Sequence, residues 1–215
     1  AASNPRRLTI DTAAPATGSS INLISDNVGI KRGRVANGAR TDDRTPTLEG
    51  TLDSTLSAGE TLGIYSGDDF LGNATVDGKT WSFTPSTNLA SDFTHSFTAR
   101  VADAAGNLGR LSNTRRLILD TARPAIRSSI TRVSDNVGIK RGRVVNGART
   151  DDRKPTLSGI LNRNLGSGAS LRIYTGKSFL GNATVKGRSW SFTPKTNLPT
   201  TRTYWFRARV ADAAG

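Results

Sequence analysis

Apolar and polar residues alternate along this chain in short runs, and turn-favouring residues separate the runs. In TPTLEGTL (45–52) and TLGIYS (61–66), apolar side chains fall on alternate positions. This period of two is typical of β-strands that bury one face. The pattern predicts seven strands in the first 120 residues: 20–24, 45–52, 61–66, 70–76, 79–85, 95–103 and 115–120.

The alternation also assigns the buried face of these strands. Asp77-Gly78 joins two alternating runs and predicts a tight hairpin turn. Trp81 and its counterpart Trp190 are interpreted as core residues. The side chains expected to point inward are Leu48, Leu62, Ile64, Val76, Trp81, Phe83, Phe97, Ala99, Val101, Leu117 and Leu119.

The chain contains an internal repeat with an offset of 109 residues. Tyr65 falls on Tyr174 and Trp81 on Trp190, and the register holds without a gap up to Gly106/Gly215. A unit of about 100 residues built from short strands is the size of an immunoglobulin-like sandwich. The predicted fold class is therefore all-β: tandem immunoglobulin-like antiparallel β-sandwiches in a linear array.

The repeat also predicts the domain boundaries. Residues 3–11 match 112–120, the last strand of the first copy. We therefore expect residues 1–11 to be the final strand of a preceding repeat, 12–120 a complete repeat, and 121–215 a repeat without its own final strand. Such a repeat leaves an open sheet edge. Two explanations stay open: a cut through a longer array, or a strand supplied by another copy through residues 3–11.

The composition excludes several classes of protein. There is no Cys, which rules out disulfides and thiolate metal sites, and no apolar run long enough for membrane insertion. The one histidine, His95, is replaced by Tyr204 in the second copy, and no nucleotide-binding motif follows a strand. An enzyme is not expected.

A second pattern concerns acidic residues in the loops. Residues 25–44 return at 134–153 with one change, Ala36 to Val145. The strand directions of an antiparallel sandwich bring the acids of these loops to junctions between repeats. The predicted central junction holds Asp26, Asp42, Asp43, Asp120 and Asp212; the preceding one holds Asp11 and Asp103; the following one holds Asp135, Asp151 and Asp152.

Clustered carboxylates suit a hard cation, so Ca²⁺ is the predicted ligand. Of the 17 acidic residues, ten form five matched pairs, and all ten lie in these loops and linkers. An alternative stays open, because basic residues share the loops: Lys31, Arg32, Arg34, Arg40 and Arg44. Arginine pairing and Asx-turn hydrogen bonds are common structural uses of loop aspartates.

The ordered motifs DNVG, NGARTDDRTPTLEG, FLGNATV, WSFTP and ARVADAAGN resemble the bacterial Ig-like repeats of giant biofilm and RTX-type adhesins. The resemblance covers nearly the whole chain. It implies an extracellular location at the bacterial cell surface, type I secretion, and Ca²⁺ at domain junctions. Carried over by motif, the Ca²⁺ candidates are Asp26 in DNVG, Asp42 and Asp43 in TDD, Asp103 and Asp212 in ADAAG, and Asp11 and Asp120 in the linkers.

The charge departs from that family, because many such repeats are acidic and this chain has a formal net charge of +13. Three functions are therefore considered. The first is a structural extender, or stalk, whose partners are the neighbouring repeats. The second is a filament subunit joined to other copies by strand exchange. The third is a basic module with weak affinity for polyanions such as acidic polysaccharide, lipopolysaccharide or DNA.

Overall fold

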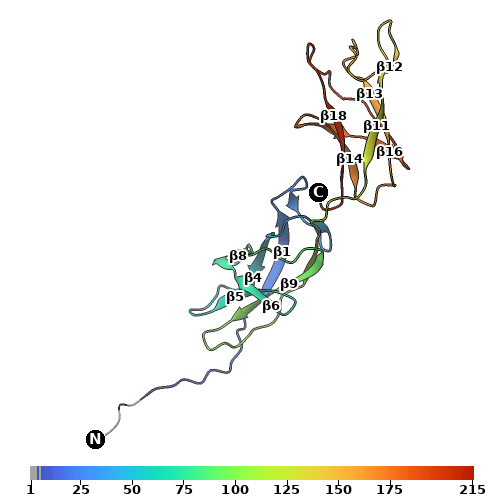
Figure 1. Cartoon of the computed structure of the whole chain (residues 1–215). Helices are drawn as coiled ribbons and strands as arrows, with labels where there is room; N and C mark the ends of the chain where they lie inside the picture. Colours follow the sequence, from blue (N-terminus) through green and yellow to red (C-terminus); the bar gives the residue numbers. More distant parts are fainter. Residues whose placement is uncertain (1–3, 5) are drawn as a thin grey trace. The chain divides into compact units, whose positions relative to one another are not determined.

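The computed structural model describes residue 4 and residues 6–215 (Figure 1). Over these residues the regular structure is β-strand, and no helix has the length and apolarity of a membrane span. The strands group into two compact units, the first extending to Thr121 and the second covering Ala122–Ala213. The predicted all-β, antiparallel sandwich class is confirmed.

The first unit is a sandwich of two five-stranded sheets. One sheet has the order β2 (Gly33–Arg34), β1 (Ser19–Asp26), β4 (Thr47–Leu52), β8 (Thr80–Phe83) and β7 (Thr75–Asp77). The other has the order β3 (Arg40–Thr41), β10 (Arg115–Leu119), β9 (Phe93–Ala102), β5 (Thr61–Ser66) and β6 (Asp69–Asn73). All neighbours are antiparallel except β3 and β10, which pair in parallel.

The second unit repeats the first sheet in full and the second sheet in part. Its first sheet has the order β12 (Gly142–Val144), β11 (Ser128–Asp135), β13 (Thr156–Leu161), β17 (Ser189–Phe192) and β16 (Thr184–Lys186). Its second sheet has three strands, β15 (Ser178–Asn182), β14 (Ser170–Thr175) and β18 (Phe206–Ala211). Within residues 122–213, no strand takes the places of β3 and β10.

The core of the first unit lies between its two sheets and includes the predicted inward-facing residues, together with Ile21, Ile24, Leu52 and Leu89. All of them are buried except Val76, which is partly buried against the same cluster. Trp81 lies opposite Gly50 on the neighbouring strand, and a Cβ added at Gly50 would lie 2.4 Å from a carbon of the Trp81 ring. Gly159 and Trp190 repeat this contact in the second unit. Both tryptophans are therefore core residues, as predicted.

Two local predictions concern the segment 70–78. The hairpin at Asp77-Gly78 is confirmed, with Gly78 at a φ of +57°. The predicted single strand 70–76 is wrong: it is divided into β6 and β7, which belong to different sheets. A bulge at the β5–β6 pairing and the positive φ of Gly72, +141°, turn the chain from one sheet to the other.

The segment 25–44 also differs from its expected loop conformation, because it contains β2 and β3. Neither has the length or alternation that predicts a strand. Each forms through its neighbour, β2 by antiparallel pairing with the end of β1 and β3 by parallel pairing with β10.

Candidate functional site

The candidate site lies at the end of the first unit where β1 and β10 finish. Ile118 is paired with Arg40 and Leu119 with Thr41, so Asp120 follows directly beside the 42–43 segment. The backbone N–H of Asp120 donates to the carbonyl of Thr41 at 2.9 Å. Four predicted site residues therefore gather at this end: Asp26, Asp42, Asp43 and Asp120.

Asp26 and Asp43 are held by a closed hydrogen-bond network around Thr41. The Thr41 hydroxyl donates to Asp26 Oδ2 and accepts from the Asp43 N–H at 3.1 Å. The N–H of Val28 donates to Asp26 Oδ1 at 2.9 Å, which forms an Asx turn. Because Asp26 is 5% exposed and Thr41 is fully buried, this network stabilises the loop from inside the fold.

The Asp43 carboxylate accepts hydrogen bonds on both of its oxygens. Asn27 N–H donates to Oδ2 at 3.0 Å, and Thr45 N–H donates to Oδ1 at 2.9 Å. The side chain is fully buried. Since a buried carboxylate must be compensated by donors, Asp43 ties the start of β4 to the end of β1.

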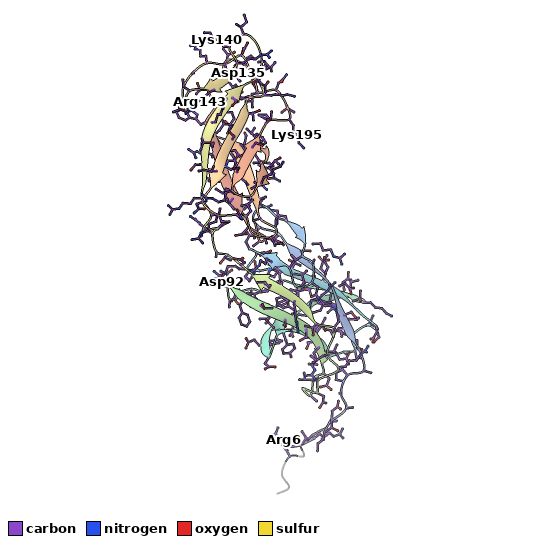
Figure 2. The ribbon with its side chains drawn as sticks, turned by 90° about the vertical axis from the view of Figure 1, so that its right-hand side faces the viewer. Arg6, Asp92, Asp135, Lys140, Arg143 and Lys195 are labelled. Atoms are coloured by element: carbon purple, nitrogen blue, oxygen red, sulfur yellow. The ribbon has the colours of Figure 1, made fainter. Side chains whose placement is uncertain are left out.

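The second unit contains the same network. The Thr150 hydroxyl donates to Asp135 and accepts from the Asp152 N–H, and Asn136 N–H donates to Asp152 at 3.1 Å. The Thr150 hydroxyl, followed by the Val137 N–H, lowers the pKa of Asp135 below its usual value of 3.8. Figure 2 shows Asp135 at one end of the second unit, the end that also carries Lys140 and Arg143.

Asp42 and Asp120 are half-buried and lie nearer to solvent. The Asp42 carboxylate rests against Gly29, where an added Cβ would lie 2.3 Å from Oδ2, and Gly29 has a φ of +61°. Asp151 lies against Gly138 in the same way, which explains why glycine is repeated at that position. Asp120 forms an ion pair with Arg40 at 3.0 Å.

Arg32 and Arg44, also in this loop, bind backbone carbonyls. Arg44 donates from Nε and Nη2 to the carbonyl of Leu89, at 3.3 and 3.2 Å, and Arg153 repeats this bond to Leu198. Arg32 Nε donates to the carbonyl of Gly29. Both structural roles considered for the aspartates therefore occur. Asp120 pairs with an arginine, whereas Asp26 and Asp43 form Asx-turn bonds.

The opposite end of the first unit carries Asp11 and Asp103. The Asn107 side-chain amide donates both to the Asp11 carbonyl at 3.0 Å and to Asp103 Oδ2 at 2.9 Å. This amide, with the backbone N–H groups of Asn107 and Ala105, lowers the pKa of Asp103. Asn107 thus connects the Asp103 carboxylate to the backbone of Asp11, while the Asp11 carboxylate accepts from the Ala13 N–H.

Asp212 follows β18 in the second unit, at the position that Asp103 has in the first. Over residue 4 and residues 6–215, no three His, Cys, Asp or Glu side chains are gathered as a metal-binding group. Within one repeat, Asp26 and Asp43 accept hydrogen bonds from donors of their own loop. Each carboxylate oxygen still has a second lone pair, so hydrogen bonding leaves these residues able to bind a cation. Ca²⁺ stays a prediction.

Two residues of this region did not stand out in the sequence. Thr41 and Thr150 link the two buried aspartates of each repeat, and their only signal was the repeated RTDD motif.

His95 and Tyr204 also share a role despite their different chemistry. His95 Nε2 lies 2.9 Å from the carbonyl of Ala90, and the Tyr204 hydroxyl donates to the matching carbonyl of Pro199 at 2.7 Å.

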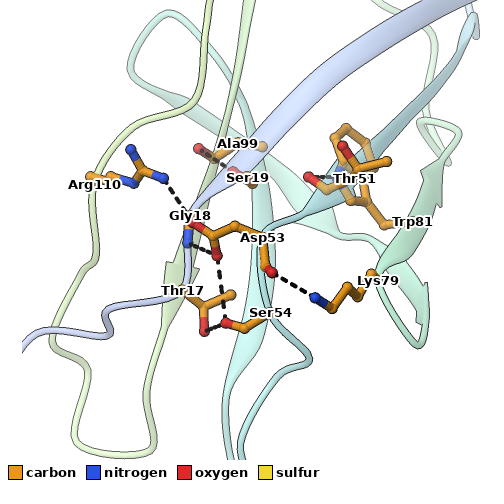
Figure 3. Close-up of polar contacts among 10 residues, drawn as sticks. All are labelled: Thr17, Gly18, Ser19, Thr51, Asp53, Ser54, Lys79, Trp81, Ala99 and Arg110. Atoms are coloured by element: carbon orange, nitrogen blue, oxygen red, sulfur yellow. Dashed lines mark hydrogen bonds and ion pairs between the residues drawn. The ribbon is translucent and has the colours of Figure 1, made fainter.

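One acid outside the repeated loops has a clear structural role. Figure 3 shows Asp53 accepting a hydrogen bond from the Gly18 N–H at 2.8 Å and forming an ion pair with Arg110, also at 2.8 Å. The Gly18 N–H and Arg110 lower the pKa of Asp53. In the second copy Asn162 accepts from the Arg127 N–H at 2.9 Å. The position thus requires an oxygen acceptor, which Asn supplies as well as Asp.

Comparison with protein families matches residues 24–121 to the family described as Bacterial Ig-like domain. The match covers the first repeat from the end of β1 to the residue after Asp120. Domains of this family are typically extracellular and non-catalytic. No curated protein matches the chain.

Proposed function

We propose that this chain, whose residues 24–121 belong to the bacterial Ig-like domain family, is a structural extender segment of a bacterial cell-surface adhesin. The observation that supports this most directly is the path of the chain through the first sandwich. The chain enters β1 at Ser19, and β10 ends beside Thr41, at the end where β1 also finishes. Each repeat of this kind adds its length to an array.

The chemistry of the loops supports a role without catalysis. The buried carboxylates Asp26 and Asp43 accept hydrogen bonds from backbone and hydroxyl donors of their own loop. His95 and Tyr204 occupy the same position in the two repeats and both contact a loop carbonyl. What the two side chains share is this contact, and not an acid–base function. These groups stabilise loop conformation, which a stiff spacer requires.

The finer part of the proposal is Ca²⁺ at the junctions between repeats. The residues that would hold the ion are the predicted set, with Asp42 and Asp120 from one repeat and Asp212 from the next at its centre. Ca²⁺ accepts ~6–8 oxygen ligands, which carboxylates and carbonyls of two repeats can share. An ion held in this way would reduce bending at the linker.

A thermal melt tests the calcium proposal. The chain would be melted in chelator, then with Ca²⁺, then with Mg²⁺. A ligand at ~100 times its Kd adds about 2.7 kcal/mol, so the midpoint should rise by several degrees with Ca²⁺ only. Small-angle scattering of the same samples should show a narrower distribution of chain dimensions with Ca²⁺.

Two variants make this test specific. Asp42→Asn and Asp120→Asn should each reduce the Ca²⁺-dependent rise. Asp77→Asn is the matched control, because Asp77 lies in the exposed β7–β8 hairpin and its counterpart is Lys186. An equal rise in all four proteins would contradict binding at the junction. The absence of any rise in the midpoint would contradict Ca²⁺ binding. The extender role would then be tested by the scattering data alone.

A further inference from the structure

The two repeats carry very different charges on equivalent strands. Residues 153–211, which hold β13 to β18, contain 11 Lys and Arg and no Asp or Glu. The aligned residues 44–102, which hold β4 to β9, contain three Lys and Arg and seven Asp and Glu. The positive charge of the chain is therefore concentrated on these strands of the second repeat rather than spread evenly along the sequence.

Part of this charge lies on the outer face of the sheet formed by β15, β14 and β18, of which Figure 1 labels β14 and β18. Alternate residues of these two strands pack in or against the core, so the residues between them point to the outer face. Arg172 on β14 lies directly opposite Arg209 on β18, and Tyr174 lies opposite Arg207. Lys177 lies in the turn between β14 and β15. The three arginines and this lysine form what we call the cationic face.

The first repeat has a different chemistry at the same positions. At three of the four positions of the cationic face it has no basic residue, and carries Gly63, Asp68 and Thr98 instead. Like charges placed directly opposite each other destabilise a sheet, so the pairing of Arg172 with Arg209 does not help the second repeat to fold. The stability of the fold therefore does not account for this face, whereas an anionic ligand would.

Two aromatic side chains hold Arg172 in place on this face. Its Cζ lies 4.0 Å from the centre of the Phe179 ring, and its Nε donates a hydrogen bond to the Tyr174 hydroxyl at 2.8 Å. Stacking on a ring and one fixed hydrogen bond reduce the number of conformations open to the side chain before a ligand arrives. Because Nε is used, the two terminal nitrogens, which carry four of the five guanidinium N–H groups, remain for a ligand.

We propose that the cationic face binds an acidic polysaccharide through the carboxylate groups of its sugar rings. The planar guanidinium groups of Arg172 and Arg207 match a carboxylate with two parallel hydrogen bonds, and Lys177 adds a point charge at the end of the sheet. Because the charges are distributed over β14, β18 and a turn, a linear polymer can contact several of them at once. The proposal concerns one face of the second repeat and does not depend on the extender role.

The geometry of the face favours a polysaccharide over a nucleic acid. Proteins that bind single strands without sequence preference combine basic residues with aromatic rings on which the bases stack. Here the Phe179 ring is already stacked with Arg172 and lies against Tyr174, with the two ring centres 5.5 Å apart. Duplex DNA is read by a helix or a two-stranded ribbon that enters a groove, whereas this face is the broad side of a three-stranded sheet. Charges without a free ring or a projecting element suit a carboxylate polymer.

Titration calorimetry of the 215-residue chain with alginate, a linear polymer of uronic acids, tests the proposal. Chelator is present throughout, so that Ca²⁺ cannot bridge protein and polymer and the calcium proposal does not affect the result. The face variant Arg172→Gln, Lys177→Gln, Arg207→Gln should bind alginate about tenfold more weakly, with an affinity that depends less steeply on salt. The matched control removes the same charge from exposed positions outside this sheet and should bind nearly as well as the parent. It is Arg163→Gln, Lys186→Gln, Lys195→Gln.

A single substitution separates guanidinium recognition from net charge. Arg172→Lys keeps the charge but loses the planar fork and the stacking on Phe179, so the affinity for alginate should fall while its slope against salt stays the same. Melting midpoints of the parent and all variants should agree within a few degrees, so that a loss of binding is not a loss of fold.

Three results would overturn the proposal. One is the absence of alginate binding by the parent chain at low salt. Another is an equal loss of affinity in the face variant and the matched control, which would show that total charge rather than this face attracts the polymer. The third is tighter binding of single-stranded DNA than of alginate at equal charge concentration, lost in the face variant, which would assign the face to nucleic acid.

Discussion

The two repeats have nearly identical loops but different strands around them. In both, a threonine hydroxyl links two buried aspartates, and the bonds agree one for one. In the first repeat, however, Thr41 is fully buried and belongs to β3, whereas Thr150 is exposed and belongs to no strand. The aspartate network is thus a local property of the loop, while β3 depends on β10.

The same comparison separates local from non-local burial in the core. Trp81 and Trp190 are each 3% exposed, because both pack on a glycine of an adjacent strand that is present in both repeats. Phe97 and Phe206 differ, because only Phe97 has β10 beside it. The strand β10 therefore decides the burial of this phenylalanine, whereas the tryptophan is buried equally in both repeats.

The largest expected effect comes from weakening β10 in the first repeat. Leu117→Ala removes a fully buried side chain and should lower the free energy of unfolding of the first repeat by about 2–5 kcal/mol. The second repeat should be unaffected, and Leu8→Ala, at an exposed position, should have little effect in dilute protein. Urea unfolding followed by Trp81 fluorescence, with Trp190 and Trp205 replaced by Phe, measures the first repeat alone. An equal loss of unfolding free energy from Leu8→Ala would contradict the conclusion that β10 supplies the last strand of the first repeat.

The threonine network should respond differently in the two repeats. Thr41→Val removes the hydroxyl that bonds Asp26 Oδ2 and the Asp43 N–H, which costs about 1–3 kcal/mol. Thr150→Val breaks the same bonds at an exposed position, where water replaces the hydroxyl, so its cost should be smaller. Unfolding curves of each repeat provide the comparison. Equal losses would show that burial of the threonine does not matter.

Acid should destabilise the second repeat through Asp135. Its pKa is lowered by the Thr150 hydroxyl and the Val137 N–H, so the folded state binds a proton less readily than the unfolded state. The stabilisation is present above the ordinary pKa of 3.8 and is lost as the pH falls through the lower folded value. Melting midpoints measured from about pH 6 to about pH 2 should fall less steeply for Asp135→Asn than for the parent.

Asp103 provides the matching experiment in the first repeat. The Asn107 amide lowers its pKa, so Asp103→Asn should also flatten the acid limb of the stability curve. Asp69→Asn, at an exposed position of β6, is the control and should leave that limb unchanged. If the melting midpoint of Asp69→Asn fell as little in acid as those of Asp103→Asn and Asp135→Asn, the acid sensitivity would not come from Asp103 and Asp135.

The smallest effect is expected at Asp53, where the two copies differ in chemistry. Asp53→Asn keeps the acceptor for the Gly18 N–H and loses only an exposed ion pair with Arg110, so the melting midpoint should change little. Asp53→Ala loses both and should lower the midpoint further. Calorimetry of the two variants measures both midpoints. Equal decreases in the midpoint would show that the charge of Asp53, rather than its acceptor oxygen, is needed.

Much of the fold follows from the sequence because alternation reports burial directly. Leu48, Leu62, Phe97 and Leu117 were assigned to the core from period alone and are fully buried. The division of 70–76 between two sheets was missed, because the bulge and the φ of Gly72 depend on Ile64 and Tyr65 of the partner strand. Such pairing leaves no trace in the local pattern.

The candidate site was predictable in position and less so in detail. Strand directions placed Asp26, Asp42, Asp43 and Asp120 at one end of the repeat, where the structure has them. The internal partners were left open between arginine and backbone donors, and both occur. Thr41 was missed because its function depends on a hydroxyl positioned between the Asp26 carboxylate, fifteen residues away, and the Asp43 backbone N–H, two residues away.

The pairing of β10 with β9 has a mechanical consequence. Force applied to the ends of the first repeat enters at Ser19 and leaves at Asp120, at opposite ends of the sandwich, so it acts along the strands. The five residue pairs from Arg115–Phe97 to Leu119–Phe93 are then sheared together rather than opened one after another. Resistance to pulling is governed by the rate of unfolding. The last strand of the repeat therefore carries the load at one end of the domain, as the β1–β4 pairing does at the other.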